Sequence, residues 1–207
     1  MNRRTFATMF ASASAILLLA IGSSHAEMKV GAPAPGFSAV NSDGKTVNLK
    51  DYRGKTIVLE WTNDGCPYVR KHYGSGNMQA LQKKWTEQGV VWLSVISSPP
   101  GEQGFADGTR ANSLTTERKA TPTAVLLDPK QEVARAFGAT VTPHMYIIKP
   151  DGALAYAGGI DDKPTTRPGD IKGAKNYVDE ALAELKAGKP VSNPATRAYG
   201  CTVKYSS

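Results

Sequence analysis

One of the two cysteines, Cys66, stands where a reactive thiol would be expected, between an apolar run and a proline. The β-branched run over residues 56–62 predicts a buried strand. Pro67 suits the first turn of a helix, because its missing N–H is not needed there. Cys66 is therefore expected at a strand-to-helix junction, where free backbone N–H groups and the positive helix end stabilise a thiolate. A small buried hydrophobic residue is the alternative interpretation.

A second feature is Thr142-Pro143-His144, directly before an apolar run that predicts a strand over residues 145–148. Proline is usually excluded from a central strand because it cannot donate to the ladder. A cis peptide bond at the strand entrance is one solution, and such bonds are rare. An ordinary trans proline at the start of the strand is the other, and the local sequence leaves both open.

Strands and helices alternate through the rest of the chain. Asn41 to Lys45 predicts a hairpin turn near the N-terminus, because Gly44 tolerates a positive φ. The alternation predicts an α/β fold, with a largely parallel central sheet, helices on both faces and an antiparallel hairpin at one edge. Further strands are expected at 90–96, 123–127 and 153–157, and further helices around 78–88, 111–119, 132–137 and 174–185.

The composition limits the possible classes of protein. With 207 residues, 41% hydrophobic and 21% charged, the chain is long and apolar enough for one globular domain. Two cysteines exclude a disulfide-rich scaffold and a four-cysteine zinc site. The net charge of +7 is dispersed, without the basic and aromatic interleaving expected of a nucleic-acid binder. No phosphate-binding glycine motif joins a strand to a helix, so no nucleotide cofactor is expected.

The N-terminus is typical of a secretory signal. Residues 1–26 combine two early arginines, an uncharged stretch over 6–22, and small side chains at Ser24 and Ala26. An uncleaved anchor is the alternative, although the uncharged stretch is marginal for spanning a bilayer core of about 30 Å. We expect cleavage and export to the periplasm or outside the cell, by the general or the twin-arginine route. After cleavage, no stable membrane insertion is expected.

The exported chain is expected to comprise one domain over 27–190 and an irregular, polar tail over 191–207. The exported compartment would be oxidising, so the two cysteines could rest there as a disulfide.

Three segments resemble the thioredoxin superfamily, in its peroxiredoxin-like branch of the AhpC/TSA or redoxin type. Residues 59–67 (LEWTNDGCP) resemble the active-site strand and turn, and 141–152 (VTPHMYIIKPDG) the cis-proline strand and hairpin. Residues 31–37 (GAPAPGF) resemble the N-terminal hairpin of the branch. The resemblance spans about 29–187. It implies a central mixed sheet with helices on both faces, an N-terminal hairpin extension, and thiol redox chemistry without a cofactor or metal.

The chain also departs from the patterns of that superfamily. Val69 stands where a dithiol thioredoxin has its second cysteine, so Cys66 cannot close a local disulfide. Asn63 and Leu59 stand where typical peroxiredoxins have threonine and proline. Peroxide activation needs donors that stabilise the thiolate and the leaving oxygen. Asn63 and nearby backbone N–H groups are the candidates for that role.

Cys201, in the tail, offers a distant partner for Cys66. The tail would fold over the active edge, so that Cys201 resolves a sulfenic acid or mixed disulfide on Cys66. One alternative is a permanent disulfide that fixes the tail and stabilises the folded state by about 4–5 kcal/mol on a loop-entropy model. The other alternative is that Cys66 and Cys201 do not pair at all. Thr142 and Pro143 would shape the substrate groove and keep metals away from the thiolate.

Several charged residues near Cys66 have two possible interpretations. Glu60 lies in the apolar strand, where a buried carboxylate would have a raised pKa and relay protons. The more ordinary expectation is an exposed Glu60, or one paired with a lysine. Arg70 and Lys71 would lower the pKa of the thiol if they lie close to it, or would simply form a basic helix face.

His72 and His144 could join Cys66 in a soft metal site, as in copper-delivery relatives of this fold. We expect instead that His72 lies on the surface, and we predict no metal.

The sequence therefore predicts an exported thiol-dependent oxidoreductase with Cys66 as nucleophile and Cys201 as resolving partner. Asn63, Thr142 and Pro143 complete the predicted site. The substrate would be a peroxide, or a protein or small-molecule disulfide, and an external thiol would act as reductant. Two rivals remain: a non-catalytic binding module with a structural Cys66–Cys201 disulfide, and a thiol protein of metal delivery or cytochrome biogenesis.

Overall fold

A computed structural model describes residues 28–206 of the chain. The predicted signal, residues 1–26, lies outside the described part. The strands are β1 (Ser38–Asn41), β2 (Thr46–Asn48), β3 (Ile57–Trp61), β4 (Val91–Ile96), β5 (Ala124–Leu127), β6 (Val141–Thr142), β7 (His144–Ile148), β8 (Leu154–Gly158) and β9 (Cys201–Thr202). The α-helices are α1 (Pro67–Gly74), α2 (Asn77–Thr86), α3 (Gly108–Glu117), α4 (Glu132–Phe137) and α5 (Tyr177–Lys186). Two short 3-10 helices are η1 (Leu49–Tyr52) and η2 (Pro168–Gly173).

The main sheet has seven strands in the order β2-β1-β5-β4-β3-β7-β8. Among these, β3–β4 and β4–β5 pair in parallel, and the other neighbours are antiparallel. The mixed sheet implied by the family resemblance is confirmed, whereas the largely parallel sheet expected from the alternation is wrong. The connection from β5 through α4 returns the chain to the side of the sheet where β3, β4 and β5 end. Strand β7 starts there and is therefore antiparallel to β3. The alternation of strands and helices along the sequence does not reveal this reversal of direction.

The N-terminal hairpin forms where the turn residues predict it. The Asn41 side chain accepts hydrogen bonds from the backbone N–H groups of Asp43, at 3.0 Å, and Lys45, at 2.8 Å. Gly44 has φ +78°, a conformation that costs glycine little. The hairpin extends the sheet through the pairing of β1 with β5, so the predicted N-terminal extension is confirmed.

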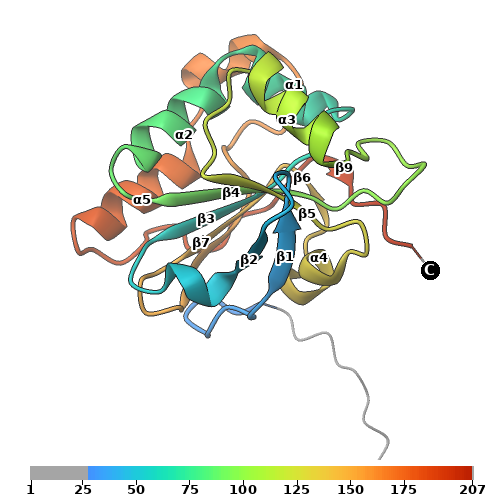
Figure 1. Cartoon of the computed structure of the whole chain (residues 1–207). Helices are drawn as coiled ribbons and strands as arrows, with labels where there is room; N and C mark the ends of the chain where they lie inside the picture. The colour runs from blue at the N-terminus through green and yellow to red at the C-terminus, as the bar shows by residue number, and fades with distance from the viewer. Residues whose placement is uncertain (1–27, 207) are drawn as a thin grey trace, which may run out of the picture.

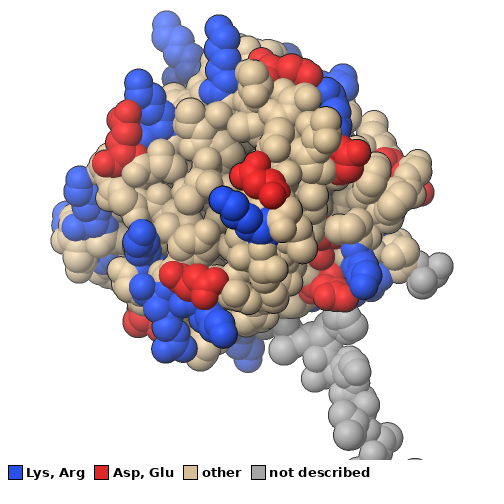
Figure 2. Space-filling model, viewed as in Figure 1, with Lys and Arg blue, Asp and Glu red and all other residues tan. Residues whose placement is uncertain are grey.

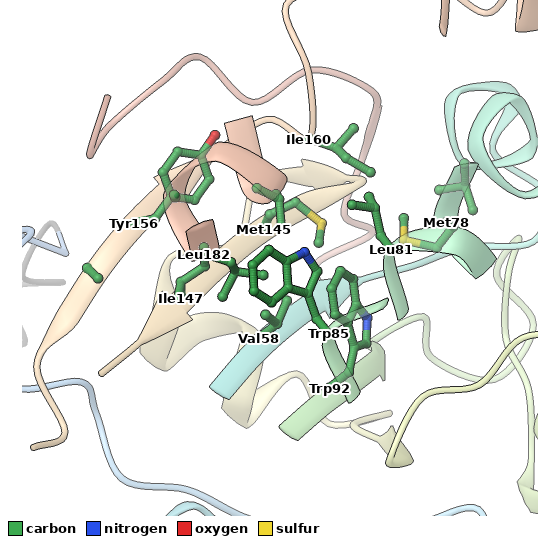
Figure 3. Close-up of a cluster of buried hydrophobic side chains, with 14 of the residues drawn as sticks. Val58, Met78, Leu81, Trp85, Trp92, Met145, Ile147, Tyr156, Ile160 and Leu182 are labelled. Atoms are coloured by element: carbon green, nitrogen blue, oxygen red, sulfur yellow. The ribbon is translucent and has the colours of Figure 1, made fainter. Parts of the chain in front are cut away.

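One face of the sheet is covered by α1, α2, α3 and α5, and α4 lies on the opposite face (Figure 1). On the first face, Val58, Trp92 and Ile147 of three strands pack against Trp85 of α2 and Leu182 of α5 (Figure 3). Alternate residues of a strand face opposite sides, so the apolar runs of β3, β4 and β7 supply both cores.

The opposite core is aromatic and lies under the C-terminal edge of β3. Trp61 contacts Phe137 of α4 at 5.6 Å between ring centroids and Tyr146 of β7 at 5.2 Å. The Trp61 indole N–H donates to Ser97 at 3.0 Å, so the buried polar edge of the ring is satisfied. This packing makes the end of β3, which leads into Cys66, a rigid platform.

The surface is charged but not strongly divided. On the face that Figure 2 shows, basic and acidic side chains are interspersed and separated by neutral surface. Within residues 28–206, no helix has the length and apolar character needed to cross a bilayer.

Candidate active site

Cys66 occupies the predicted junction at the carboxyl end of β3. It is the N-cap residue of α1, with Pro67 in the first helical turn. Its carbonyl accepts a hydrogen bond from the backbone N–H of Arg70 at 3.0 Å. The Cys66 side chain is fully buried, with 0% of its surface exposed. The sulfur thus lies against the amino end of a helix and away from bulk water.

The second predicted feature lies directly beside Cys66. The peptide bond between Thr142 and Pro143 is cis, which selects the first of the two interpretations left open by the sequence. The antiparallel pairing of β3 with β7 places this bond next to the end of β3, because Trp61 is the ladder partner of His144. The Cys66 thiol donates a hydrogen bond to the Thr142 carbonyl, with 3.1 Å between sulfur and oxygen.

Cys201 lies at the same place. The tail forms a short strand, β9, that pairs with β6 and sets Cys201 opposite Thr142. Cys201 packs against the buried cluster that contains Cys66, each thiol shifts the pKa of the other, and both cysteines are free thiols in this structure. The structure therefore brings together Cys66, Thr142, Pro143 and Cys201, although the sequence predicted an irregular tail.

Gly200 explains how the tail approaches so closely. A Cβ atom on Gly200 would lie 1.9 Å from the Thr142 carbonyl oxygen, and its φ is +145°. Another residue would therefore both clash and be strained at this position. The dipeptide Gly200-Cys201 is the local signal in the sequence that marks this close approach.

The two thiols have different acidities. Burial raises the pKa of Cys66, but hydrogen bonds from Cys201, the Val69 N–H and the Thr142 side chain outweigh it, so the pKa lies below its ordinary value. Burial, together with the hydrogen bond and the charge of Cys66, raises the pKa of Cys201 to about 12. Cys66 is therefore the more acidic thiol of the pair, and Cys201 holds its proton while Cys66 is ionised.

Asn63 does not donate to the sulfur. Its side chain accepts from the Gly65 N–H at 2.8 Å and donates to the Gln103 carbonyl at 3.0 Å. Its carbonyl accepts from the Cys66 N–H at 3.1 Å. Asn63 thus shapes the turn that carries Cys66 and joins it to the loop containing Gln103. The predicted role of Asn63 as a donor to the reacting oxygen stays a prediction.

Glu60 is buried beneath the active edge, and the expectation that it is exposed or paired with a lysine is wrong. Its carboxylate accepts hydrogen bonds from four side chains. The donors are Tyr73 at 2.7 Å, Trp92 at 2.8 Å, and Gln82 and Ser94 at 3.1 Å. Burial raises the pKa of Glu60, and these hydrogen bonds only partly oppose the rise.

Glu60→Gln is expected to remove a pH-dependent loss of stability. The folded-state pKa of Glu60 lies above the unfolded value. The wild type therefore loses stability as the pH rises from the unfolded-state pKa to the folded-state pKa of Glu60. The glutamine amide does not ionise, so the variant lacks this loss. Urea unfolding measures the free energy of unfolding of both proteins from about pH 4 to about pH 8. As the pH rises over this range, the variant should become more stable relative to the wild type. Glu87→Gln, at an exposed position, is the control. A difference that does not vary with pH would contradict this prediction.

Lys71 and His72 are also buried, so the predictions of a basic helix face and of a surface histidine are wrong. Lys71 forms an ion pair with Asp161 at 3.2 Å, and Tyr199 of the tail lies between Lys71 and His72. Arg70 is exposed and donates to the Asp64 carbonyl at 2.7 Å. Neither Arg70 nor Lys71 is among the main causes of the pKa shift of Cys66. Tyr199 of the tail contacts both side chains, and the sequence near Lys71 and His72 does not reveal such a distant contact.

The histidines do not join Cys66 in a metal site. The ring of His144 packs on Tyr146 with 4.5 Å between centroids, and its Nδ1 accepts from the Thr140 N–H at 3.3 Å. In the part of the chain that the structure describes, no three histidine, cysteine, aspartate or glutamate side chains are grouped as metal ligands.

Comparison with known proteins agrees with this geometry. The AhpC/TSA family matches residues 30–157, more than half of the chain and the segment that contains β3, Cys66 and the cis proline. The chain belongs to the AhpC/TSA family. The match ends before the tail, so Cys201 lies outside the matched residues.

Individual relatives of this AhpC/TSA protein are distant. Thiol-disulfide oxidoreductase ResA of Bacillus cereus is 27% identical over 132 residues, 64% of this chain and 70% of that protein. Glutathione peroxidase of Lactococcus lactis is 27% identical over 78 residues, 38% of this chain and 48% of that protein. A crystal structure of an uncharacterized conserved protein from Geobacillus kaustophilus superposes with a TM-score of 0.76 and 26% identity, covering 87% of this chain and 94% of that one.

Proposed function

We propose that this AhpC/TSA family protein is an exported thiol-dependent oxidoreductase in which Cys66 is the nucleophile and Cys201 the resolving cysteine. The observation that carries the proposal is that both cysteines meet at Thr142, which pairs with Cys201 and accepts a hydrogen bond from the Cys66 thiol. The pair is 135 residues apart in sequence, yet β6 and β9 hold Cys201 in register with Thr142. Such an arrangement lets a disulfide form without a large movement of the chain.

In the first step, the Cys66 thiolate attacks one oxygen of a peroxide ROOH. The O–O bond breaks, Cys66 becomes a sulfenic acid, and RO⁻ leaves and takes a proton from solvent to give ROH. The hydrogen bonds that lower the pKa of Cys66 supply the thiolate. Backbone N–H groups at the start of α1 are available to the developing charge.

In the second step, Cys201 displaces the oxygen from Cys66. Oxidation removes the negative charge from Cys66, and that charge is one of the causes of the high pKa of Cys201. Cys201 then loses its proton more easily and attacks the Cys66 sulfur. An S–S bond forms, and the hydroxide that leaves takes up a proton to give water. Two external thiols reduce the disulfide and are themselves oxidised to a disulfide.

The burial of Cys66 favours a small oxidant. The sulfur has no exposed surface, so a peroxide reaches it with less movement of the tail than a protein disulfide needs. The relatives point both ways, since one is named a thiol-disulfide oxidoreductase and another a glutathione peroxidase. A disulfide substrate is therefore the second candidate, with the same cysteine pair. Export rests on the signal pattern of residues 1–26.

The test is rapid mixing of the reduced protein with hydrogen peroxide or with a protein disulfide, followed by acid quench, alkylation and peptide mapping. We expect one equivalent of peroxide to convert both thiols into a Cys66–Cys201 disulfide. This reaction should be much faster than the oxidation of free cysteine by peroxide. Faster reaction with the protein disulfide would assign the disulfide substrate instead. A bridge that neither oxidant forms quickly, with a potential below about −300 mV, would indicate a structural disulfide and contradict the proposal.

A further inference from the structure

The tail is fastened to the domain on both sides of Cys201. Upstream, Thr196 donates its N–H to the Ala157 carbonyl at 3.1 Å, and its hydroxyl lies 2.6 Å from that of Tyr156. Downstream, Val203 donates its N–H to the Thr140 carbonyl at 2.9 Å. These contacts join the tail to β8 and to Thr140, just before β6. They do not by themselves show which contact keeps the tail closed over Cys66.

A buried polar cluster around Tyr199 is the strongest candidate for the contact that keeps the tail closed. The Tyr199 hydroxyl donates to the Asp161 carboxylate, and Lys71 Nζ lies 3.2 Å from that carboxylate and 3.4 Å from the Tyr199 oxygen. Lys71 also donates to the Lys163 carbonyl at 2.6 Å. The side chains of Lys71 and Asp161 are at most 1% exposed, so this ion pair is shielded from water. Hydrogen bonds to charged groups in such surroundings are strong, and they are costly to leave unmade.

His72 completes the set of partners of Tyr199. Its Nδ1 lies 2.9 Å from the side-chain nitrogen of Asn77, which donates to it. Burial lowers the pKa of His72 to about 4, so the ring is neutral near pH 7 and its proton lies on Nε2. Nε2 lies 3.3 Å from the Tyr199 oxygen and donates to it. The Tyr199 hydroxyl therefore both donates and accepts within the cluster.

The cluster connects both cysteines to the same helix, α1. Cys66 is the N-cap of α1, and Lys71, in the middle of the same helix, lies beside Tyr199. Tyr199 is two residues before Cys201, with Gly200 pressed against Thr142 between them. The position of Tyr199, together with the pairing of β9 with β6, thus restricts where Cys201 lies relative to Cys66. On the other side of Cys201, Tyr205 is 37% exposed, and its hydroxyl donates to the Ala139 carbonyl at 2.6 Å.

We propose that Tyr199, Lys71 and Asp161 are positioning residues that hold the tail closed over Cys66 and keep Cys201 at its sulfur. Their part in resolution rests on the proposed function, whereas the closure of the tail does not. Without the Tyr199 hydroxyl, the tail would open more often, and Cys66 would become accessible without unfolding of the domain.

The experiment measures the accessibility of Cys66 in a Cys201→Ser background, where one thiol remains. Iodoacetamide is added at constant pH, and the alkylation rate is followed by mass spectrometry. Tyr199→Phe is expected to raise the rate about tenfold to a hundredfold, because it removes one buried hydrogen bond to a charged acceptor. Amide exchange of Val203, which is expected to accelerate in the same variant, gives a second readout of tail opening.

Tyr73→Phe is the matched control, because it also removes a hydroxyl that donates to a buried carboxylate, that of Glu60. Both variants should lower the urea midpoint, but only Tyr199→Phe should expose Cys66. An unchanged alkylation rate in Tyr199→Phe, or an equal rise in Tyr73→Phe, would overturn the inference. Neither result depends on an oxidant, so a failure of this inference is distinguishable from a failure of the proposed redox cycle.

Discussion

Replacing Cys66 with serine is expected to lower thiol-dependent reduction of peroxide or disulfide by about a thousandfold or more. The serine hydroxyl fits the buried site but stays protonated, because its pKa is far above that of a thiol. The hydrogen bonds that stabilise the thiolate then have no anion to act on. Consumption of hydrogen peroxide in the presence of dithiothreitol, and reduction of a protein disulfide, measure the loss.

Cys201→Ser is the matched control, since it changes the other member of the pair in the same way. This variant should still consume one equivalent of peroxide at Cys66, but it should form no intramolecular disulfide and stop as a sulfenic acid. A dimedone adduct on Cys66 would identify that state. A Cys66→Ser protein that retains a tenth or more of the activity would show that the chemistry lies elsewhere.

Replacing Lys71 with methionine is expected to lower the free energy of unfolding by about 3–5 kcal/mol, a large change for a single residue. Methionine replaces the aliphatic part of the lysine but leaves the Asp161 carboxylate buried without its cation. Tyr199 and the Lys163 N–H, at 2.9 Å, remain as donors, and they do not neutralise the charge. Urea unfolding at neutral pH measures the loss.

Lys84→Met tests whether burial is the cause. Lys84 also pairs with an aspartate, Asp179, at 2.6 Å, but the lysine side chain is 48% exposed. Water screens such a pair, so this change should cost less than about 1 kcal/mol. Equal losses in the two variants would contradict the assignment of the Lys71–Asp161 pair as a buried structural ion pair.

The reactive cysteine was predictable because its signals are local. A β-branched run, then Cys66 and Pro67, specifies a strand, a sulfur and a helix start within a dozen residues, and the structure has all three in place. Pro143 before a strand left two possibilities, and the family resemblance favoured the cis bond that the structure has. The hairpin at Asn41 was equally local, because a short polar side chain and a glycine determine its turn.

The partners of these residues could not be read in the same way. Helical spacing describes which residues share a face of α1, but it does not say what covers that face. The tail and Asp161 cover Lys71 and His72, and three strands and two helices enclose Glu60, so residues that look exposed in the sequence are buried. The direction of β7 similarly depends on where α4 returns the chain, a relation between distant segments.

Local propensity and turn chemistry act within a few residues, so they sufficed for the strands of the main sheet, most helices, the hairpin and the position of Cys66. The acidity of that sulfur and the place of its partner depend on contacts across the fold. Cys201 reaches Cys66 because β9 pairs with β6, Gly200 leaves room for Thr142, and Tyr199 is bound to α1. These contacts form only when segments more than 50 residues apart pack together, and burial then changes the pKa of each group they surround.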